Sequence, residues 1–341
     1  MIAHDIVATG ILMSGPLKNF EPHPLLRGAH LMTIAPVFWR RKFFLPPAEE
    51  RLFQVDSESQ LLAHCHWQPC NRSEAPVMVI VHGLEGSSDS DYARGVAETA
   101  FTRGYNAIRI NQRNCGDSEA LTPTLYNSGM SSDYRAVCDE LVDRDDFKQI
   151  FFSGYSMGGN LVLKMGGEYR EGFPPALRGI CAVCPALDLA ACANALERWD
   201  NYFYQRHFVI GLLERYRRKA MSLPDRYRQN GFGAIRTVRQ FDDAITAPNA
   251  GYRDAQEYYE TASAKRVLKH LQVPTLIITA KDDPFVPYPS ILAAGAEKNP
   301  KITLIAPKHG GHCAFISRQG GTARFWAERC IVDFCDALRT T

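Results

Sequence analysis

Ser156 stands between Gly154 and Gly158, directly after the apolar run 149–153 and before the helix-like stretch 160–169. A serine on a sharp turn from a strand into a helix presents its hydroxyl for chemistry, and flanking glycines leave room for such a turn. The pattern G-x-S-x-G alone is expected by chance in about one chain in ten of this length. The flanking elements therefore lead us to interpret Ser156 as a nucleophile on an elbow-like turn.

A serine hydroxyl is a poor nucleophile at neutral pH, so it needs a histidine as general base and a carboxylate that orients the histidine. On such a turn the expected chain order is serine, then acid, then histidine. Asp283, in KDDPFVP, and His312, in HGGH, each follow an apolar run. Open parallel sheets place their sites at such strand ends. We therefore predict Ser156, Asp283 and His312 as the catalytic residues.

Each of these two partners has a rival in the sequence. Asp282 precedes Asp283 and is expected to cap the turn, whereas Asp188 follows an earlier apolar run. His309 shares the loop of His312 and fits an exposed residue. Other histidines are expected to be structural or exposed, namely His30, His207 and His270.

Acyl transfer also needs an oxyanion hole, which backbone N–H groups commonly form. We expect one donor at Met157 and the second at Leu84, in the stretch HGLEG that follows another apolar run. His82, Gly83 and Tyr155 are expected to contact the substrate. A glycine-rich turn with no further role is the alternative for HGLEG.

Apolar runs of strand length alternate with helical stretches along most of the chain. The expected strands are 51–55 and 61–67 as a hairpin, then 77–81, 106–110, 149–153, 178–183, 274–279 and 302–305. The expected helices are 92–103, 133–142, 160–169 and 322–338. Such alternation predicts a mostly parallel central sheet flanked by helices on both faces.

The alternation stops between Leu187 and Lys269, where the chain is helical, polar and aromatic. We predict a core formed by residues 1–186 and 270–341, with a helical cap inserted at 187–269. The aromatic residues of the cap form an apolar wall for a substrate or pack the cap onto the sheet. They are Trp199, Tyr202, Phe203, Tyr204, Phe208 and Tyr216.

Composition and charge exclude several classes of protein. The 341 residues include 39 Lys and Arg and 37 Asp and Glu, a net charge of +2 that does not favour nucleic acid. The basic run 215–219 fits a solvated helix face better than a lipid contact. Apolar runs of about 18 residues do not occur, so no transmembrane helix is expected. Residues 1–20 have no cationic start, which argues against a secretory signal and favours a cytoplasmic location.

The 10 cysteines are spread through the chain and are expected to be reduced and mostly buried. The pair Cys181 and Cys184 lies in an expected buried strand without a second CxxC, which argues against a zinc or redox site. His64, Cys65 and His66, with Cys70 nearby, also have the side chains of metal ligands. Because side chains alternate along a strand, these ligands would lie on two opposite faces, which argues against a metal site. No metal is expected.

Several motifs together resemble the YheT-like branch of the α/β-hydrolases, which is related to the eukaryotic α/β-hydrolase-domain lipases. They are LRGAHLMTI from Leu26, HGLEGSSDSDYARG from His82, GYSMGGN from Gly154, RQFDDAITAPNAGY from Arg239, AKDDPFVP from Ala280 and HGGHCAF from His309. The resemblance implies the α/β-hydrolase fold and an esterase or lipase-like activity without a cofactor. It also implies a small-molecule ester or lipid substrate.

The family's catalytic triad corresponds to Ser156, Asp283 and His312 in this sequence. Two departures affect other positions. Asn114 stands where the family usually has glycine, and Met32 where it often has glutamine. Asparagine tolerates a positive φ better than most residues, so we expect the turn at 113–115 to be kept.

The sequence supports three hypotheses for function. The first is a hydrolase that cleaves carboxylic esters through an acyl-enzyme on Ser156. The second is an acyltransferase that uses the same residues and passes the acyl group to an alcohol. The third is a non-catalytic binding protein of the same fold. Dehalogenase and epoxide hydrolase chemistry are disfavoured because their nucleophile is a carboxylate. Acyl length, oligomeric state and peripheral membrane contact stay open.

Overall fold

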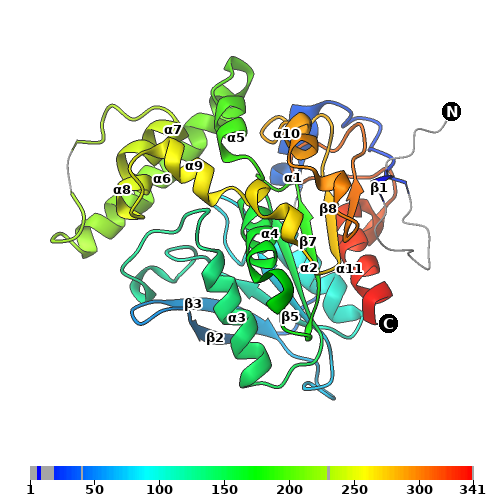
Figure 1. The fold of residues 1–341 in the computed structure, drawn as a ribbon. Helices are drawn as coiled ribbons and strands as arrows, with labels where there is room; N and C mark the ends of the chain where they lie inside the picture. Colours follow the sequence, from blue (N-terminus) through cyan, green and yellow to red (C-terminus); the bar gives the residue numbers. More distant parts are fainter. Residues whose placement is uncertain (1–5, 9–18, 40, 229–230, 340–341) are drawn as a thin grey trace.

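The computed structural model describes residues 6–8, 19–39, 41–228 and 231–339. Most of the stretch 1–20, on which the argument against a secretory signal rests, lies outside the described residues. Within the described part, a nine-stranded sheet has the order β1-β9-β8-β7-β6-β4-β5-β3-β2 (Figure 1). No described helix combines the length and the apolar character that a membrane crossing would need.

The middle of the sheet is parallel and its two edges are antiparallel. The parallel strands are β5 (Asn106–Ile110), β4 (Val77–Val81), β6 (Ile150–Tyr155), β7 (Leu177–Val183), β8 (Thr275–Ile278) and β9 (Ile302–Ile305). The antiparallel edge strands are β2 (Glu49–Gln54) and β3 (Gln60–His66) on one side and β1 (Ile6–Ala8) on the other. The predicted mostly parallel sheet is therefore confirmed.

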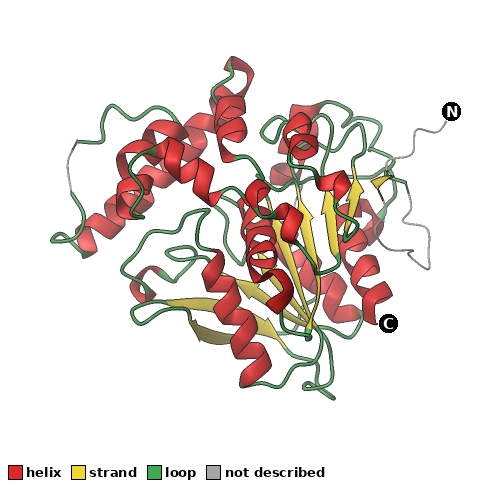
Figure 2. Ribbon diagram, in the orientation of Figure 1, coloured by secondary structure: helices red, strands yellow, loops and turns green. Residues whose placement is uncertain are grey.

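Side chains along β4 alternate between two hydrophobic cores, one on each face of the sheet. Val77, Val79 and Val81 pack with helices α3 (Ser131–Asp143) and α4 (Met157–Tyr169) on one face. Met78 and Ile80 pack with α2 (Asp91–Thr102) and α11 (Trp326–Arg339) on the other face. Both faces of the central strands are thus covered by helices, as a parallel sheet requires (Figure 2).

The chain between β7 and β8 contains helices and no strand among its described residues, 184–228 and 231–274. These helices are α5 (Leu189–Leu196), α6 (Tyr202–Ser222), α7 (Val238–Phe241), the π-helical turn η4 (Asp242–Thr246), α8 (Ala247–Asn249) and α9 (Ala255–Ala262), together with the 3-10 turns η3 (Trp199–Asn201), η5 (Ala264–Arg266) and η6 (Leu268–His270). Figure 1 shows α6 to α9 grouped to one side of the sheet. We propose that this segment acts as the cap, and the division at 187 and 269 stays a prediction.

Several elements differ from the sequence-based expectation. Strand β6 continues to Tyr155 and α4 begins at Met157, so the turn at Ser156 is tighter than predicted. Helix α11 begins at Trp326 instead of residue 322, because a short 3-10 turn precedes it. Three elements were not expected: β1, α1 (Ala29–Phe38), which contains a proline, and α10 (Tyr288–Ala293).

Candidate active site

Ser156 occupies a strained turn between β6 and α4. Its backbone has φ 53° and ψ −116°, a region that non-glycine residues rarely adopt. A Cβ at Gly154 would lie 2.2 Å from the carbonyl oxygen of Gly158, and a Cβ at Gly158 would lie 2.4 Å from the carbonyl oxygen of Val81. Both positions therefore require glycine, and the turn cannot form without them.

Ser156, His312 and Asp283 form one hydrogen-bonded chain. The Ser156 Oγ lies 3.0 Å from Nε2 of His312, and Nδ1 of His312 lies 2.9 Å from Oδ2 of Asp283. The Asp283 side chain is fully buried, and its Oδ1 accepts the N–H groups of Phe285 and Val286 at 2.8 and 2.9 Å. These contacts fix the carboxylate and leave His312 with its Nε2 turned toward the serine.

Asp283 also favours the protonated form of His312. Burial disfavours the imidazolium, but the attraction of the Asp283 carboxylate outweighs it and raises the pKa of His312 above its ordinary value. Contact with the Cys184 thiol acts in the same direction. Because burial raises the pKa of Cys184 well above the usual range, this thiol is neutral at neutral pH and Asp283 carries the shift. An imidazolium formed during a reaction is therefore stabilised.

The rival residues lie in other contacts. Asp282 does not cap its own turn, as was predicted, because Asp283 accepts the N–H groups there. Asp282 instead accepts two backbone N–H groups of the loop that carries His312, both at 3.0 Å, and its carboxylate lies 3.2 Å from His309. Asp188 caps the start of α5 and pairs with Lys265 at 2.6 Å. His30 stacks on Tyr204, away from the chain of Ser156.

The loop after β4 packs directly against the elbow. A Cβ at Gly83 would lie 3.1 Å from the Cβ of Ser156, so the backbone at this point approaches the serine closely. Met157 is the first residue of α4, and its N–H therefore has no acceptor within the helix. Within the described part of the chain, the N–H of Leu84 makes no hydrogen bond. Leu84 and Met157 stay the predicted oxyanion donors.

The three predicted substrate contacts differ in their surroundings. Gly83 and Tyr155 line a hollow next to Ser156, although the Tyr155 ring is buried and stacks on Tyr92 at 4.4 Å. His82 is fully buried, and its Nε2 accepts the N–H of Gln112 at 3.1 Å. Burial lowers the pKa of His82 to about 4, so it is neutral. His82 is not among the residues that line the pockets next to Ser156, so its contact with a substrate stays a prediction.

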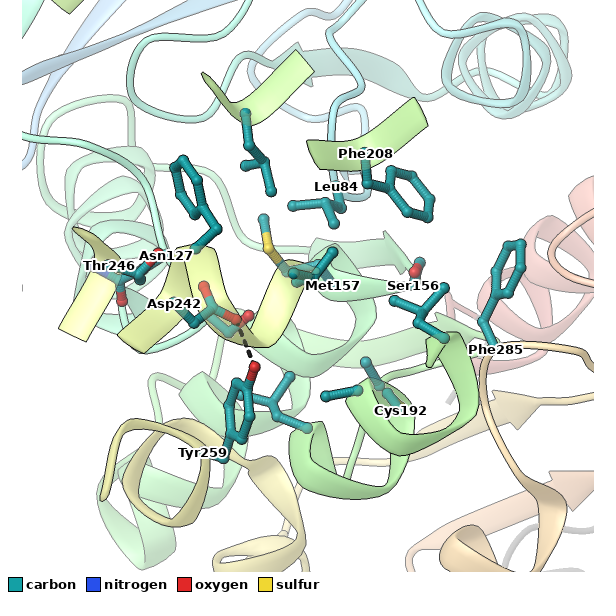
Figure 3. A pocket seen from close by; sticks show the side chains of 18 of the residues that line it. Leu84, Asn127, Ser156, Met157, Cys192, Phe208, Asp242, Thr246, Tyr259 and Phe285 are labelled. Carbon is teal, nitrogen blue, oxygen red and sulfur yellow. Dashed lines mark hydrogen bonds between the residues drawn. The ribbon is translucent and has the colours of Figure 1, made fainter. Parts of the chain in front are cut away.

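Two hollows meet at Ser156. The first, which we call the cap-side cavity, has a volume of about 110 Å³ and is lined by residues of α5, α6, α7, η4 and α9. Figure 3 shows part of its lining, including Ser156. The second, which we call the α1-side hollow, has a volume of about 440 Å³. It is bordered by α1 and by the Arg41–Glu328 ion pair, whose atoms lie 2.6 Å apart. Both hollows are lined by Leu84, Ser156, Phe208 and His312.

The aromatic residues of the cap divide into three groups. Neither predicted role, an apolar wall for the substrate or packing of the cap onto the sheet, accounts for all of them. Phe208 lines both hollows, whereas Tyr204 packs edge-on against Phe285 at 4.6 Å. Phe285 in turn contacts the ring of His312 at 4.6 Å. Tyr216 packs within the cap segment itself. The prediction was wrong for three exposed residues, Trp199 in the 3-10 turn before α6 and Tyr202 and Phe203 at the start of α6.

Cys184 lies beside His312 and the adjacent Cys313, which the sequence did not indicate. The Cys313 N–H donates to Cys184 Sγ at 3.3 Å, and ligand atoms of both cysteines and His312 lie within 4.8 Å of one another. A metal there would compete with the bonds from His312 to Ser156 and Asp283. We therefore interpret the two thiols as packing of the histidine loop.

The other sequence candidates for a metal site face different partners. Cys181 lies 3.9 Å from Cys335 instead of next to Cys184. His64 contacts the hydroxyl of Ser88, and His66 Nδ1 lies 2.9 Å from a backbone carbonyl oxygen.

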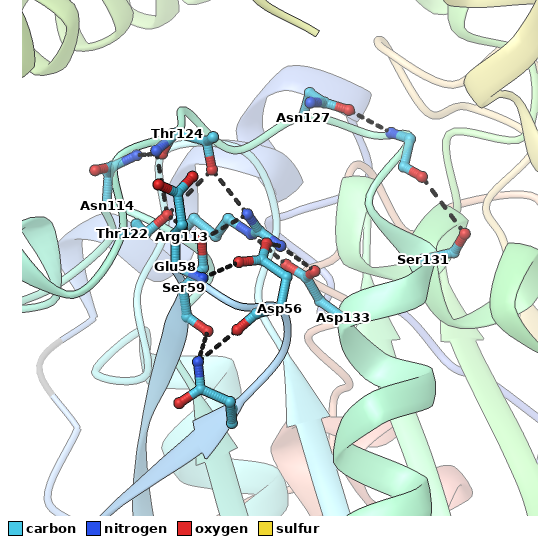
Figure 4. A network of polar contacts seen from close by, with 12 residues as sticks. Asp56, Glu58, Ser59, Arg113, Asn114, Thr122, Thr124, Asn127, Ser131 and Asp133 are labelled. Carbon is cyan, nitrogen blue, oxygen red and sulfur yellow. Dashed lines mark hydrogen bonds and ion pairs between the residues drawn. The ribbon is translucent and has the colours of Figure 1, made fainter.

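An Arg113-centred network positions the loop that closes the cap-side cavity (Figure 4). Arg113 bonds to Asp133 at 2.6 and 2.7 Å, to Asp56 at 2.8 Å and to the Thr124 hydroxyl at 2.8 Å. Asn114 has φ 62°, which confirms that the turn is kept with asparagine in place of glycine. The loop that follows supplies residues 125–128 of the cavity wall.

Comparison with known proteins places the chain in a family. Residues 76–319 match the family model described as alpha/beta hydrolase fold. The chain is 32% identical over 324 residues to YheT of Escherichia coli (strain K12), by its name a candidate esterase. This alignment covers 94% of the present chain and 92% of YheT.

Two Saccharomyces cerevisiae (strain ATCC 204508 / S288c) proteins are also similar. A monoacylglycerol lipase is 29% identical over 265 residues, and medium-chain fatty acid ethyl ester synthase/esterase 2 is 27% identical over 290 residues. The alignments cover 74% and 76% of this chain but only 57% and 62% of the yeast proteins. Est1E of Butyrivibrio proteoclasticus, solved with ferulic acid, matches with a TM-score of 0.56 and 16% identity over 85% of this chain and 100% of its own. That likeness concerns the fold.

Proposed function

We propose, from the premise that the chain belongs to the α/β hydrolase fold family, that it is a serine hydrolase that cleaves carboxylic esters through an acyl-enzyme on Ser156. The observation that carries the proposal is the hydrogen-bonded chain from Ser156 through His312 to Asp283 on a strained turn. Relatives named as esterases and lipases support the same class of activity.

In the first half of the reaction, Ser156 Oγ attacks the ester carbonyl carbon and its proton passes to Nε2 of His312. The bond to Asp283 holds the proton on Nδ1 and stabilises the imidazolium. The N–H groups of Leu84 and Met157 donate to the oxygen that becomes negative. His312 then protonates the alcohol oxygen, the ester C–O bond breaks, and the acyl group stays on Ser156.

In the second half, a water molecule takes the place of the alcohol. His312 removes a proton from the water as the oxygen attacks the acyl carbon, and returns a proton to Ser156 Oγ as the bond to the serine breaks. The carboxylic acid leaves and the free enzyme is restored. No other group is needed, since the proton accepted in each half is given back.

We assign the acyl chain to the cap-side cavity and the alcohol to the α1-side hollow. Most residues in the wall of this cavity are apolar, as a hydrocarbon chain requires. They include Leu125, Leu189, Leu196, Leu212, Val238 and Phe241. The α1-side hollow is larger and contains the Arg41–Glu328 pair, which suits a polar alcohol group.

Acyl transfer to an alcohol is the second candidate, and it is favoured by the similarity to a protein named as both a synthase and an esterase. An alcohol that enters the α1-side hollow after the first product leaves would accept the acyl group in place of water. Product analysis in the presence of a competing alcohol separates the two. A new ester as the main product indicates transfer, whereas the free acid indicates hydrolysis.

The first test is covalent labelling of the purified protein by a fluorophosphonate probe, which reacts with activated serines. We expect labelling of the wild type and none of Ser156→Ala, with a loss of at least a hundredfold in labelling rate for His312→Ala. His309→Ala is the matched control, because this histidine lies in the same loop and contacts Asp282. Equal labelling of wild type and Ser156→Ala would contradict the proposal.

A further inference from the structure

The far end of the cap-side cavity is polar, which an acyl pocket for a plain hydrocarbon does not need. Figure 3 shows Ser156 at one end of the cavity and Asp242, Thr246 and Asn127 at the other, with Met157 between them. The Tyr259 hydroxyl donates to Asp242 Oδ2 at 2.7 Å in this polar end. The cavity therefore changes from apolar to hydrogen-bonding with distance from the serine.

Asp242 is a buried carboxyl without a cation. Its side chain lines the cavity, and only 9% of the residue is exposed. Among the described residues no Lys, Arg or His forms an ion pair with it, and the neighbouring Arg239 pairs with Glu197 at 3.0 Å instead. Burial raises the pKa of Asp242 to about 6, against smaller opposite effects of Thr246 and Tyr259.

A carboxyl in such a place is costly to the folded protein, because burial of an unpaired charge is unfavourable. The backbone there is also unusual, since Asp242 begins the π-helical turn η4, a conformation that often occurs at functional sites. The proposed mechanism makes no use of Asp242. These features are explained if the carboxyl accepts a hydrogen bond from a ligand in the cavity.

Resting on the function proposed above, we infer that the preferred acyl group is short and ends in a hydroxyl, which donates a hydrogen bond to Asp242. An engineered cavity of about 150 Å³ in another protein binds benzene, so a cavity of about 110 Å³ suits a chain of about four to five carbon atoms beyond the carbonyl carbon. Asn127 also lines the polar end, and because its Oδ1 accepts the N–H of Gly129, its side-chain N–H groups stay as donors to the oxygen of the same hydroxyl.

The test compares two ethyl esters that differ at one end of the acyl chain. Ethyl 6-hydroxyhexanoate carries the hydroxyl, and ethyl heptanoate has a methyl group in its place. We expect the wild type to prefer the hydroxy ester by about tenfold or more in kcat/KM. With the heptanoate, a methyl group faces the buried Asp242 carboxylate, which then lacks the hydrogen bond from the ligand. Asp242→Asn should reduce that ratio at least fivefold, because a neutral amide is a weaker acceptor than a carboxylate.

Asp225→Asn is the matched control, because it removes the same charge from an exposed position of the same segment and should leave the ratio unchanged. Tyr259→Phe serves as the second variant. It removes the bond to Asp242 but keeps the carboxyl, so it should keep most of the preference. Thermal melting of each variant reports whether it folds.

Three results would overturn the inference. One is equal kcat/KM for the two esters in the wild type, another is a ratio unchanged by Asp242→Asn, and the third is a preference for a hydroxyl on the alcohol chain instead. Turnover of ethyl heptanoate that is lost in Ser156→Ala supports the proposed esterase in every case. Failure of the inference is therefore distinguishable from failure of the proposed function.

Discussion

At the scale of single residues, the site combines a strained nucleophile with a tightly held acid. The backbone conformation of Ser156 costs about 1–3 kcal/mol for a non-glycine residue. The surroundings maintain it, since Gly154, Gly158 and the carbonyl of Val81 pack without space for a Cβ. Asp283 accepts two backbone N–H groups in addition to His312, so the orientation of the imidazole follows from the fold.

The raised pKa of His312 predicts the pH dependence of activity. His312 acts as a base only when neutral, so kcat/KM should rise with pH, with a midpoint above the ordinary histidine value of about 6.5. Asp283→Asn removes the carboxylate that stabilises the imidazolium. We expect its midpoint to shift to lower pH and its maximal rate to fall by at least a hundredfold. The measurement is initial rate on a short ester from pH 5 to about 10.

Asp282→Asn is the control for this profile, since Asp282 bonds to His309 and the loop backbone instead of His312. Its midpoint should match that of the wild type. The same midpoint in Asp283→Asn and the wild type would show that the carboxylate does not set the pKa of His312. The raised pKa of His312 also affects the stability of the folded protein. The protonated histidine adds stability at low pH, and this contribution is lost as the pH rises through the pKa of His312 in the folded state.

The sequence predicted the residues that meet at Ser156 better than those that shape the pocket. Asp283 and His312 follow apolar strands in a known order, so their approach to Ser156 follows from the topology of a parallel sheet. Asp242 and Cys184 gave no such signal. Their place depends on how the cap segment and the histidine loop pack, which local sequence patterns do not specify.

At the scale of elements, the turn at Asn114 links the sheet to the cavity wall. Asn114 has φ 62°, and its side-chain amide donates to the carbonyl oxygen of Thr124. Arg113 next to it holds Asp133 and Thr124, which fixes the loop that enters the cavity at Leu125. The position of the cavity wall therefore depends on one left-handed residue and one buried arginine.

Replacement of Asn114 should separate backbone strain from the side-chain bond. Asn114→Ala should lower the free energy of unfolding by about 1–2 kcal/mol beyond the effect of Asn114→Gly, because alanine disfavours a left-handed backbone and glycine does not. Both variants lose the bond to Thr124, so the difference between them isolates the strain. Urea denaturation gives the two values, and equal destabilisation would contradict the argument.

The elements that the sequence missed or placed wrongly each have a physical reason. Helix α1 contains Pro36, which normally ends a helix pattern, and β1 has three residues, too few for a detectable alternation. Helix α4 starts three residues earlier than expected, because glycines at 158 and 159 hide the helical periodicity. Long elements with regular spacing, such as α2 and α3, were predicted to within two residues.

At the scale of the whole molecule, two cations of α6 tie the cap segment to loops of the sheet. The Arg215 side chain lies 3.3 Å from Glu85 and bonds to the carbonyl oxygen of Asn114. Lys219 is buried and donates to the carbonyl oxygen of Thr122 at 2.7 Å. Glu85 follows Leu84 directly, so the cap segment is joined to the loop that carries a predicted oxyanion donor.

These contacts allow a test of whether residues 187–269 open as a unit. The double variant Arg215→Met and Lys219→Met keeps the apolar stems but removes both cations. We expect amide hydrogen exchange to become faster across α5 to α9, because local opening is controlled by the contacts of a segment, while β4, β6 and β7 keep their protection. Hydrogen exchange followed by mass spectrometry resolves the two regions.

Arg217→Met is the control, since Arg217 is exposed on the same helix and forms no ion pair with the described residues. It should leave both regions unchanged. Equal loss of protection in the cap segment and the central strands of the double variant would mean that they unfold together, which would contradict a separate cap. A selective loss would support a cap that opens over Ser156. Because residues of the cap segment and of the elbow line the cap-side cavity together, easier opening of the cap should then raise both the KM and the rate of product release.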